Sequence, residues 1–471
     1  MSTTTTTTTA KDSFDRFGDD LTELLLRYLS NNDRLRLDCV SKQWQSLIFI
    51  RQTHLRFDDK LLKSWSKDLD INFKTVNQIV KLFESIVRKC PNLTSVIISD
   101  VYLMNSYLDL LVQHCRQLRH LCLLSETSGS GGHQRTLNDN TIDRLFLTFA
   151  DQLLTFKFDG HDYDLNRQLF YKAIDLLPNL QTLDITANRK TILYLNLIFT
   201  DDFCYVLPKT LNSFAVRLNN HLMPWFVLFA ETYGQQMLEL NITIDKISSP
   251  PDELVTGLAQ MSQLRQLTID LIYNASCELF LPILSAIGHH NCPQLQGLHL
   301  KGLNCQKTFV PQLFAELNKH VSHVRQLSIM CSLVSYDSTI DNQVISAALN
   351  SMNRLTDLSI NVLFRCPLIG DQFFRDIHQH LPQLKRLRVD RAAITATTKA
   401  GTIQSLAQLA NLTDLYLHCE PIFIMPSPDY IDNHLIGVNT SVRHVCIKYS
   451  DSDHRPQTYL YGRYRSMISD N

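Results

Sequence analysis

Histidine and cysteine side chains are the first groups in this sequence whose types and spacing could carry out chemistry. His114 precedes Cys115 and His418 precedes Cys419, and such a pair could supply a thiol nucleophile with its base, or two metal ligands. Adjacent residues on a strand point to opposite faces, however, so neither pair acts together if it lies on a strand. Cys-x-x-Cys, His-Glu-x-x-His and Gly-x-Ser-x-Gly motifs are all absent from the sequence. We therefore expect no catalysis, no metal and no cofactor.

A glycine-rich segment at 128–132, Ser-Gly-Ser-Gly-Gly, is the candidate for a phosphate-binding loop. It lacks the Lys-Ser/Thr that follows such a loop, and no strand pattern comes before it. We interpret it as an inserted flexible loop.

The cysteines and the start of the chain indicate the compartment. The 12 cysteines are spread evenly, and the sequence begins with Met1, Ser2 and a run of threonines from Thr3 to Thr9. This start has neither the basic nor the apolar region of a signal peptide, and no apolar stretch is long enough to span a membrane. We expect reduced thiols in a cytoplasmic and/or nuclear protein with no membrane association.

Composition narrows the classes further. The 45 Lys and Arg residues nearly balance the 46 Asp and Glu residues, for a net charge of −1, which argues against a nucleic-acid partner. Leucine is abundant, at 74 of 471 residues, whereas only 14 are glycine. Such a composition is typical of a helical or repetitive chain.

A repeated pattern, apolar-x-x-apolar-x-apolar, decides the fold. It recurs about every 29 residues. The clearest of its 13 copies begin at Leu180, Leu264, Leu295, Leu355, Leu384 and Leu412, and weaker copies begin at Leu93, Leu118, Leu153, Leu211, Met237, Val324 and Val442. Counting the first apolar residue as position 1, positions 4 and 6 point one way from a short strand, and positions 3, 5 and 7 point the other.

Helical patterns lie between the copies, as at 76–87, and one strand with one helix buries its apolar face only by stacking on the next unit. The pattern resembles the leucine-rich repeat, in its cysteine-containing class, because Cys90, Cys115 and Cys292 stand three residues before position 1. The resemblance implies an α/β fold, a leucine-rich-repeat solenoid (horseshoe) of about 13 repeats with a parallel sheet on its concave face. We expect these cysteines to be small buried apolar residues.

Residues 14–57 do not follow the repeat. They predict three short helices, the first beginning near Asp19 and Asp20, and so form a thin core. Tyr28-Leu29, Asp33-Arg34-Leu35 and Val40-Ser-Lys-Gln-Trp44, in this order, resemble the F-box family, although Phe17-Gly18 stands where that family has Leu-Pro.

The resemblance implies docking to a Skp-type adaptor, and through it to a cullin–RING ubiquitin ligase, while the repeats hold a protein substrate. The implied adaptor surface and its supporting core comprise Phe14, Phe17, Leu21, Leu24, Leu25, Leu29, Leu35, Val40 and Trp44. The alternative is a leucine-rich-repeat interaction scaffold whose N-terminal helices only cap the solenoid, since terminal repeats need a cap.

Positions 3, 5 and 7 of the last copies supply the candidate substrate surface. They combine basic and aromatic side chains, which are frequent at protein interfaces: Arg386, Arg388, Tyr416, His418, His444 and Lys448. A solvated sheet face without a specific ligand is the other interpretation.

The expected domain organisation therefore has five parts. These are a Thr-rich tail (1–12), the F-box-like helical module (13–60), a linker with the first repeat helix (61–90), the leucine-rich repeats (91–450) and a C-terminal tail (451–471).

Overall fold

A computed structural model describes most of the chain, which divides into two compact units, Met1–Leu211 and Asn212–Asn471. The described residues are 19–29, 33–34, 42–59, 61–63, 76–99, 104–124, 139–158, 172, 174–185, 200–245, 252–272, 279–305, 309–333, 342–362, 371–375, 377–392, 399–419, 431–450 and 456–462.

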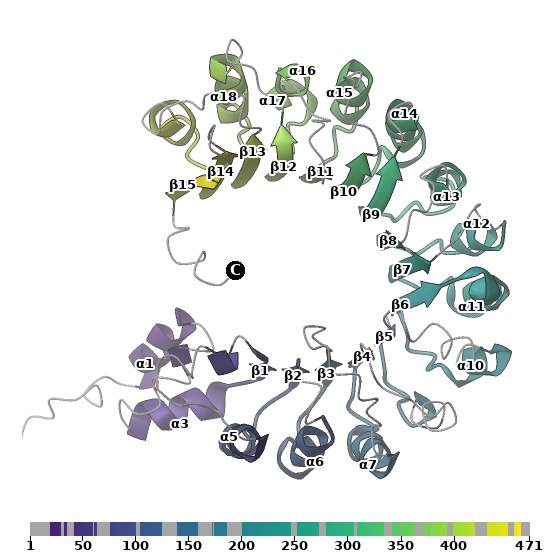
Figure 1. Ribbon diagram of the computed structural model, residues 1–471, viewed down its shortest axis with the longest axis vertical. Coiled ribbons are helices and arrows are strands. Elements are labelled where there is room, and N and C mark those ends of the chain that lie inside the picture. Colours follow the sequence, from purple (N-terminus) through teal and green to yellow (C-terminus); the bar gives the residue numbers. More distant parts are fainter. Residues whose placement is uncertain are drawn as a thin grey trace, which may run out of the picture. The chain divides into compact units, whose positions relative to one another are not determined.

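The first unit begins with helices and continues as alternating strands and helices (Figure 1). Its helices are α1 (Asp19–Arg27), α3 (Lys42–Arg51), α5 (Val76–Lys89), α6 (Met104–His114), α7 (Asp139–Phe149) and α10 (Asp201–Val206). Its strands are β1 (His54–Phe57), β2 (Ser95–Ile98), β3 (His120–Leu123), β4 (Thr155–Phe158) and β5 (Thr182–Ile185). From β1 to β5 each strand pairs in parallel with the next.

The second unit repeats this alternation. Its strands are β6 (Ser213–Leu218), β7 (Glu239–Asp245), β8 (Gln266–Ile272), β9 (Gly297–Cys305), β10 (Gln326–Leu333), β11 (Asp357–Val362), β12 (Arg386–Ala392), β13 (Asp414–Cys419), β14 (His444–Ser450) and β15 (Pro456–Gly462). Its helices are η3 (Asn220–Leu222), α11 (Met223–Tyr233), α12 (Asp252–Ala259), α13 (Phe280–Ala286), α14 (Phe309–Val321), α15 (Asn342–Asn350), α16 (Asp371–Phe374), α17 (Ile377–His380), α18 (Lys399–Ala407) and η5 (Asp432–Ile436).

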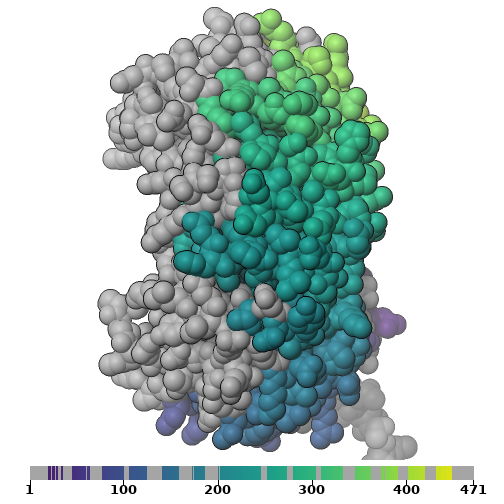
Figure 2. Space-filling model, turned by 90° about the vertical axis from the view of Figure 1, so that its right-hand side faces the viewer, coloured from purple at the N-terminus to yellow at the C-terminus, as the bar shows by residue number. Residues whose placement is uncertain are grey.

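Strands β6 to β14 pair in parallel in chain order, and β15 alone pairs antiparallel, with β14. Within this unit the helices lie on one side of the sheet, because parallel neighbours require a crossover connection (Figure 1). Figure 2 shows their outer surface, where α11 to α14 run from teal to green.

The strands confirm the repeat that the sequence predicts. Each of the copies that begin between Leu93 and Val442 starts its strand at position 3. Positions 4 and 6 are buried, as at Leu183 and Ile185 of β5, whereas positions 3 and 5 of that strand are partly exposed. The fold is therefore the α/β leucine-rich-repeat solenoid.

The cysteine slot is an interior position, as the sequence predicts. Cys90, Cys115 and Cys292 are fully buried, and burial raises the pKa of each thiol to about 12. These thiols therefore stay protonated near neutral pH and pack as apolar groups. The argument that His114 and Cys115 point to opposite faces of a strand does not apply, because His114 is the last residue of α6 and Cys115 follows the helix.

Two strands lie outside the predicted repeats. β1 falls in the range 13–60 that the sequence assigns to helices, and Phe57 of this strand packs edge-on against Phe83 of α5, with ring centroids 4.9 Å apart. Its turn is tied to β2, since the backbone N–H groups of Thr94 and Ser95 both donate to the carbonyl oxygen of Thr53, at 2.9 and 3.0 Å. The other strand, β15, occupies part of the expected tail 451–471 and adds seven residue pairs to β14.

None of the described helices is long and apolar enough to cross a lipid bilayer. Among the described His, Cys, Asp and Glu residues, no group of three or more is arranged to hold a metal ion.

Candidate functional site

The six predicted substrate-binding residues come together on three adjacent strands of the second unit. Arg386 and Arg388 lie on β12, Tyr416 and His418 on β13, and His444 and Lys448 on β14. The register places Arg388 beside Tyr416, and His418 beside the backbone of Lys448. Because parallel strands stack like positions side by side, residues about 30 positions apart in the sequence become neighbours on one face.

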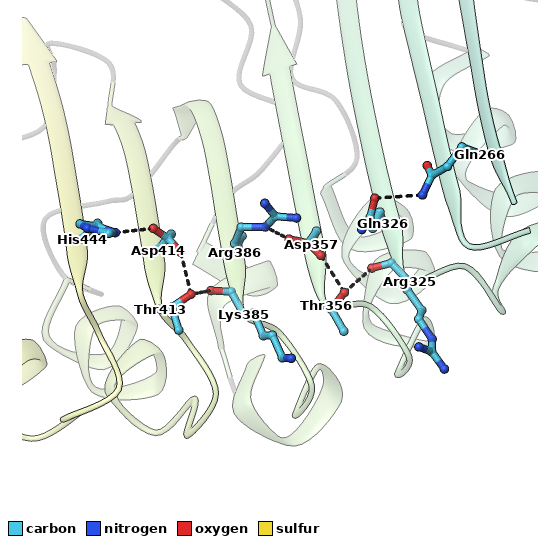
Figure 3. A network of polar contacts seen from close by, with 10 residues as sticks. All are labelled: Gln266, Arg325, Gln326, Thr356, Asp357, Lys385, Arg386, Thr413, Asp414 and His444. Atoms are coloured by element: carbon cyan, nitrogen blue, oxygen red, sulfur yellow. Dashed lines mark hydrogen bonds and ion pairs between the residues drawn. The ribbon is translucent and has the colours of Figure 1, made fainter. Parts of the chain in front are cut away.

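Acidic and basic side chains alternate along position 3 of the last four parallel strands. Asp357, Arg386, Asp414 and His444 are successive register partners from β11 to β14. Arg386 Nε donates to Asp357 Oδ1, and His444 Nδ1 lies 2.7 Å from Asp414 Oδ1 (Figure 3). We call these four residues the charge row.

A threonine at position 2 orients each acid of the charge row. Thr413 Oγ1 lies 2.6 Å from Asp414 Oδ2 and 3.1 Å from the carbonyl oxygen of Lys385 in the preceding repeat. Thr356 makes the same two contacts, at 2.7 Å to Asp357 Oδ2 and 3.1 Å to the Arg325 carbonyl (Figure 3). Each acid is the third residue of the same tetrapeptide, Leu-Thr-Asp-Leu, which occurs at 355–358 and at 412–415.

Hydrogen bonding sets the ionisation of Asp414. Partial burial would by itself raise the pKa of this carboxyl, but hydrogen bonds with Thr413 and His444, together with the charges of His444 and Arg386, lower the pKa below its usual value. Asp414 is therefore an anion at neutral pH.

Arg388 and Tyr416 form a stacked pair at position 5. The guanidinium carbon of Arg388 lies 4.5 Å from the centre of the Tyr416 ring, and its Nε lies 3.2 Å from Asp390 Oδ2. Burial and the nearby charge of Asp390 raise the pKa of Tyr416 to about 12, so the phenol is neutral. His418 Nδ1 lies 3.9 Å from the other oxygen of Asp390, so this buried carboxylate sits between two predicted residues.

Arg386, Arg388 and Tyr416 line a hollow in the sheet face, with a volume of about 400 Å³. The polar residues that line it occupy positions 3 and 5 of β9 to β13: His299, Gln326, Ser328, Asp357, Ser359, Arg386, Arg388, Asp414 and Tyr416. His418 and His444 do not line it, and the side chain of Lys448 lies outside the described part of the chain.

Six of the lining residues, His299, Gln326, Ser328, Asp357, Ser359 and Asp414, were not among the predicted substrate-binding residues. Each occupies position 3 or 5 of its copy, so the repeat numbering itself could have identified them. Burial lowers the pKa of His299, with a further contribution from the charge of Lys301, and this imidazole is therefore neutral at physiological pH.

A glycine extends the polar surface beyond the hollow. Gln266 Nε2 on β8 lies 3.4 Å from Gln326 Oε1 on β10, which is two strands away. Gly297 of β9 lies between them, and a Cβ added there would lie 1.8 Å from Gln266 Oε1. The missing side chain of Gly297 therefore lets the two amides meet (Figure 3).

Charged residues are also buried in the first strands of this unit. Arg217 Nη2 of β6 lies 3.2 Å from Asp245 Oδ2 of β7, and both side chains are almost fully buried. Sequence analysis did not identify this pair, because Arg217 stands at position 7, which normally faces solvent, and Asp245 stands at position 9, beyond the repeated pattern. The two opposite charges compensate each other, and loss of either would leave a buried charge unpaired.

The predicted adaptor residues lie in the first unit. On α1 the side chains of Leu21, Leu24 and Leu25 are 43%, 47% and 38% exposed, and Tyr28, directly after the helix, is 82% exposed. Leu29 is half-buried, whereas Thr22 and Leu26 on the opposite side of the helix are buried. Phe14, Phe17, Leu35 and Val40 lie outside the described residues, and Trp44 is described only as a backbone position on α3.

The helix α3 packs on the first repeat. Ile48 and Phe49 are buried, and Lys89 Nζ of α5 lies 4.9 Å from the centre of the Phe49 ring. Asn92 Nδ2 donates a hydrogen bond of 2.9 Å to the carbonyl oxygen of Ile50. α3 is therefore anchored to the repeats.

Comparison with known proteins supports the fold and gives no information about function. No family model matches the sequence, and no curated protein matches it. The similar solved structures include Rad7 in complex with Elc1 from yeast, at 14% identity and a TM-score of 0.42, covering 96% of this chain and 94% of that chain. The leucine-rich-repeat protein LegL7 of Legionella pneumophila aligns at 13% identity and a TM-score of 0.41, covering 66% and 91%. An internalin of Listeria monocytogenes aligns at 14% identity and a TM-score of 0.34, covering 78% of this chain and 87% of the internalin chain.

Proposed function

We propose that this protein is the substrate-recognition subunit of a Skp–cullin–F-box type ubiquitin ligase. In this proposal α1 docks on the Skp-type adaptor, and the sheet face of the second unit holds a protein substrate in the cytoplasm or nucleus. The chain itself performs no catalysis. The observation that carries the proposal is the exposed apolar stripe on α1, which occurs in the segment whose sequence resembles an F-box.

The stripe has the spacing of a docking face. Leu24 and Leu25 lie three and four residues after Leu21 and so share one side of α1, and Tyr28 follows directly after the helix, seven residues after Leu21. Burial of one such side chain contributes about 1.5–3 kcal/mol, so leaving several exposed on one short helix favours a partner that covers them.

The test is binding of the full chain to a purified Skp-type adaptor. The double substitution Leu21→Glu with Leu24→Glu should weaken adaptor binding at least about 100-fold, because two buried apolar contacts are replaced by desolvated charges. Leu147→Glu is the matched control: Leu147 lies on α7, is 59% exposed, and its substitution should leave binding unchanged. Equal binding by the wild-type chain and the double variant, measured by calorimetry, rejects the proposal.

A second candidate is a leucine-rich-repeat interaction scaffold whose N-terminal helices only cap the array. The packing of Phe49 and Ile50 against α5 and the turn that follows it favours this role for α3. Under this alternative, Phe49→Ala lowers the free energy of unfolding by about 3–5 kcal/mol, and no substitution on α1 changes binding to an adaptor. Urea unfolding of Phe49→Ala beside the adaptor titration of the α1 variant separates the two functions.

A further inference from the structure

The hollow on the sheet face has unused hydrogen-bonding capacity, and that capacity consists of donors. Both carboxylate oxygens of Asp357 are occupied, by Arg386 Nε and Thr356 Oγ1. Both oxygens of Asp414 are occupied as well, by His444 Nδ1 and Thr413 Oγ1. The acids that line the hollow thus position its basic groups and have little acceptor capacity left for a ligand.

The guanidinium groups are fixed through Nε and present their other nitrogens. Arg386 is held by Asp357, and Arg388 by Asp390 and by stacking on Tyr416. Among the described residues, the Nη groups of both arginines make no hydrogen bond, and neither do the hydroxyls of Ser328 and Ser359. A guanidinium whose position is already set loses little further conformational entropy when it binds a ligand.

Shape and charge limit the ligand. Serines at position 5 of β10 and β11 leave the space, and the two arginines occupy one end of it. The formal charges of Arg386 and Arg388 cancel those of Asp357 and Asp414, so the lining offers no net positive charge to a dianion. A planar carboxylate carries one negative charge, and its two oxygens match the edge of a guanidinium.

We propose that this hollow binds the side-chain carboxylate of a glutamate or aspartate on an exposed segment of a protein partner. The carboxylate accepts hydrogen bonds from the Nη groups of Arg386 and Arg388. The hydroxyls of Ser328 and Ser359 donate hydrogen bonds to its remaining lone pairs. This inference rests on the proposed function, since it specifies the substrate that the repeats hold.

The experiment is selection of random 12-residue displayed peptides on the full-length protein. Peptides recovered on the wild-type chain should be enriched in Glu and Asp relative to the input library. The enrichment should be lost on the double variant Arg386→Gln with Arg388→Gln, which keeps side-chain length and removes both charges.

The matched control is Arg325→Gln with Lys385→Gln. Both side chains are exposed, lie one residue before position 3 of their strands, and extend away from the charge row in Figure 3. This control removes the same net charge and should select the same acidic peptides as the wild-type chain. Ser359→Met fills the hollow without changing charge and should also abolish the selection, and thermal melting confirms that each variant is folded.

A second measurement identifies the chemical group. Fluorescence anisotropy with one selected peptide should show at least about tenfold weaker binding when its glutamate becomes glutamine, since a charge-assisted pair is lost. Selection that persists on the Arg386/Arg388 variant, or tighter binding of a phosphoserine peptide than of the glutamate peptide, overturns the inference. Adaptor binding is measured separately on the Arg386/Arg388 variant and should be unchanged. A negative result for peptide selection therefore does not reject adaptor docking by α1, and a negative result for adaptor binding does not reject carboxylate binding in the hollow.

Discussion

At the scale of single residues, Asp414 connects ionisation to stability. Its folded pKa lies below the usual 3.8, so its contacts stabilise the fold above that pH, and the contribution is lost as pH falls through the folded pKa. The side chain is 37% exposed, so solvent screening keeps the effect below about 1 kcal/mol.

We therefore expect Asp414→Asn to lower the free energy of unfolding more at pH 7 than at pH 2, because the contribution of the wild-type carboxylate is lost as pH falls through its folded pKa. Urea unfolding at both pH values checks this. Asp151→Asn, at an exposed turn, should behave like the wild-type chain at each pH. A destabilisation that is equal at pH 7 and pH 2 would assign the loss to packing instead of charge.

At the scale of elements, β15 covers the last parallel strand. It pairs with β14 over all seven of its residues, from Pro456 opposite Ser450 to Gly462 opposite His444. An uncovered parallel edge presents unpaired backbone N–H and C=O groups and tends to pair with another chain.

Ending the chain after residue 450 should therefore lower the melting temperature by about 5 °C and produce concentration-dependent self-association. Ending it after residue 462 keeps β15 and should leave both properties unchanged. Calorimetry and light scattering measure the two effects. Identical behaviour of the two truncated chains would show that β15 does not protect this edge.

Some strands were predictable from the sequence and others were not. The strand of each copy was predictable because positions 4 and 6 alternate with polar neighbours. The strand at His54–Phe57 was not, because Gln52 stands where each of the copies has an apolar position 1. The six residues of the predicted substrate surface stand at the expected positions of three neighbouring strands, but Ser328 and Ser359 were missed. The repeat numbering places both serines on the sheet face, but the sequence does not show that a hollow forms there, because the hollow depends on which side chains become neighbours in space.

At the scale of the whole array, stability should depend on neighbouring repeats. Leu240 of β7 and Leu417 of β13 are buried and lie six strands apart, roughly 29 Å. Leu387 and Leu415 are buried and are direct partners across β12 and β13.

Each Leu→Ala substitution should cost about 2–5 kcal/mol. The costs at 240 and 417 should add within about 0.5 kcal/mol, whereas those at 387 and 415 should deviate from additivity by more than that, because the two side chains share one cavity. Double-mutant cycles by urea unfolding measure both sums. Strong coupling between the distant pair would contradict nearest-neighbour behaviour within this unit.

The alternation along each strand also has an evolutionary consequence. The buried side chains at positions 4 and 6 pack the repeats against one another, whereas most side chains at positions 3 and 5 take no part in that packing. Mutations at positions 3 and 5 can therefore accumulate at little cost to folding, and duplication of a unit such as Leu-Thr-Asp-Leu supplies a new acid already oriented by its own threonine. A lineage can in this way acquire a new binding preference without first having to evolve a new scaffold.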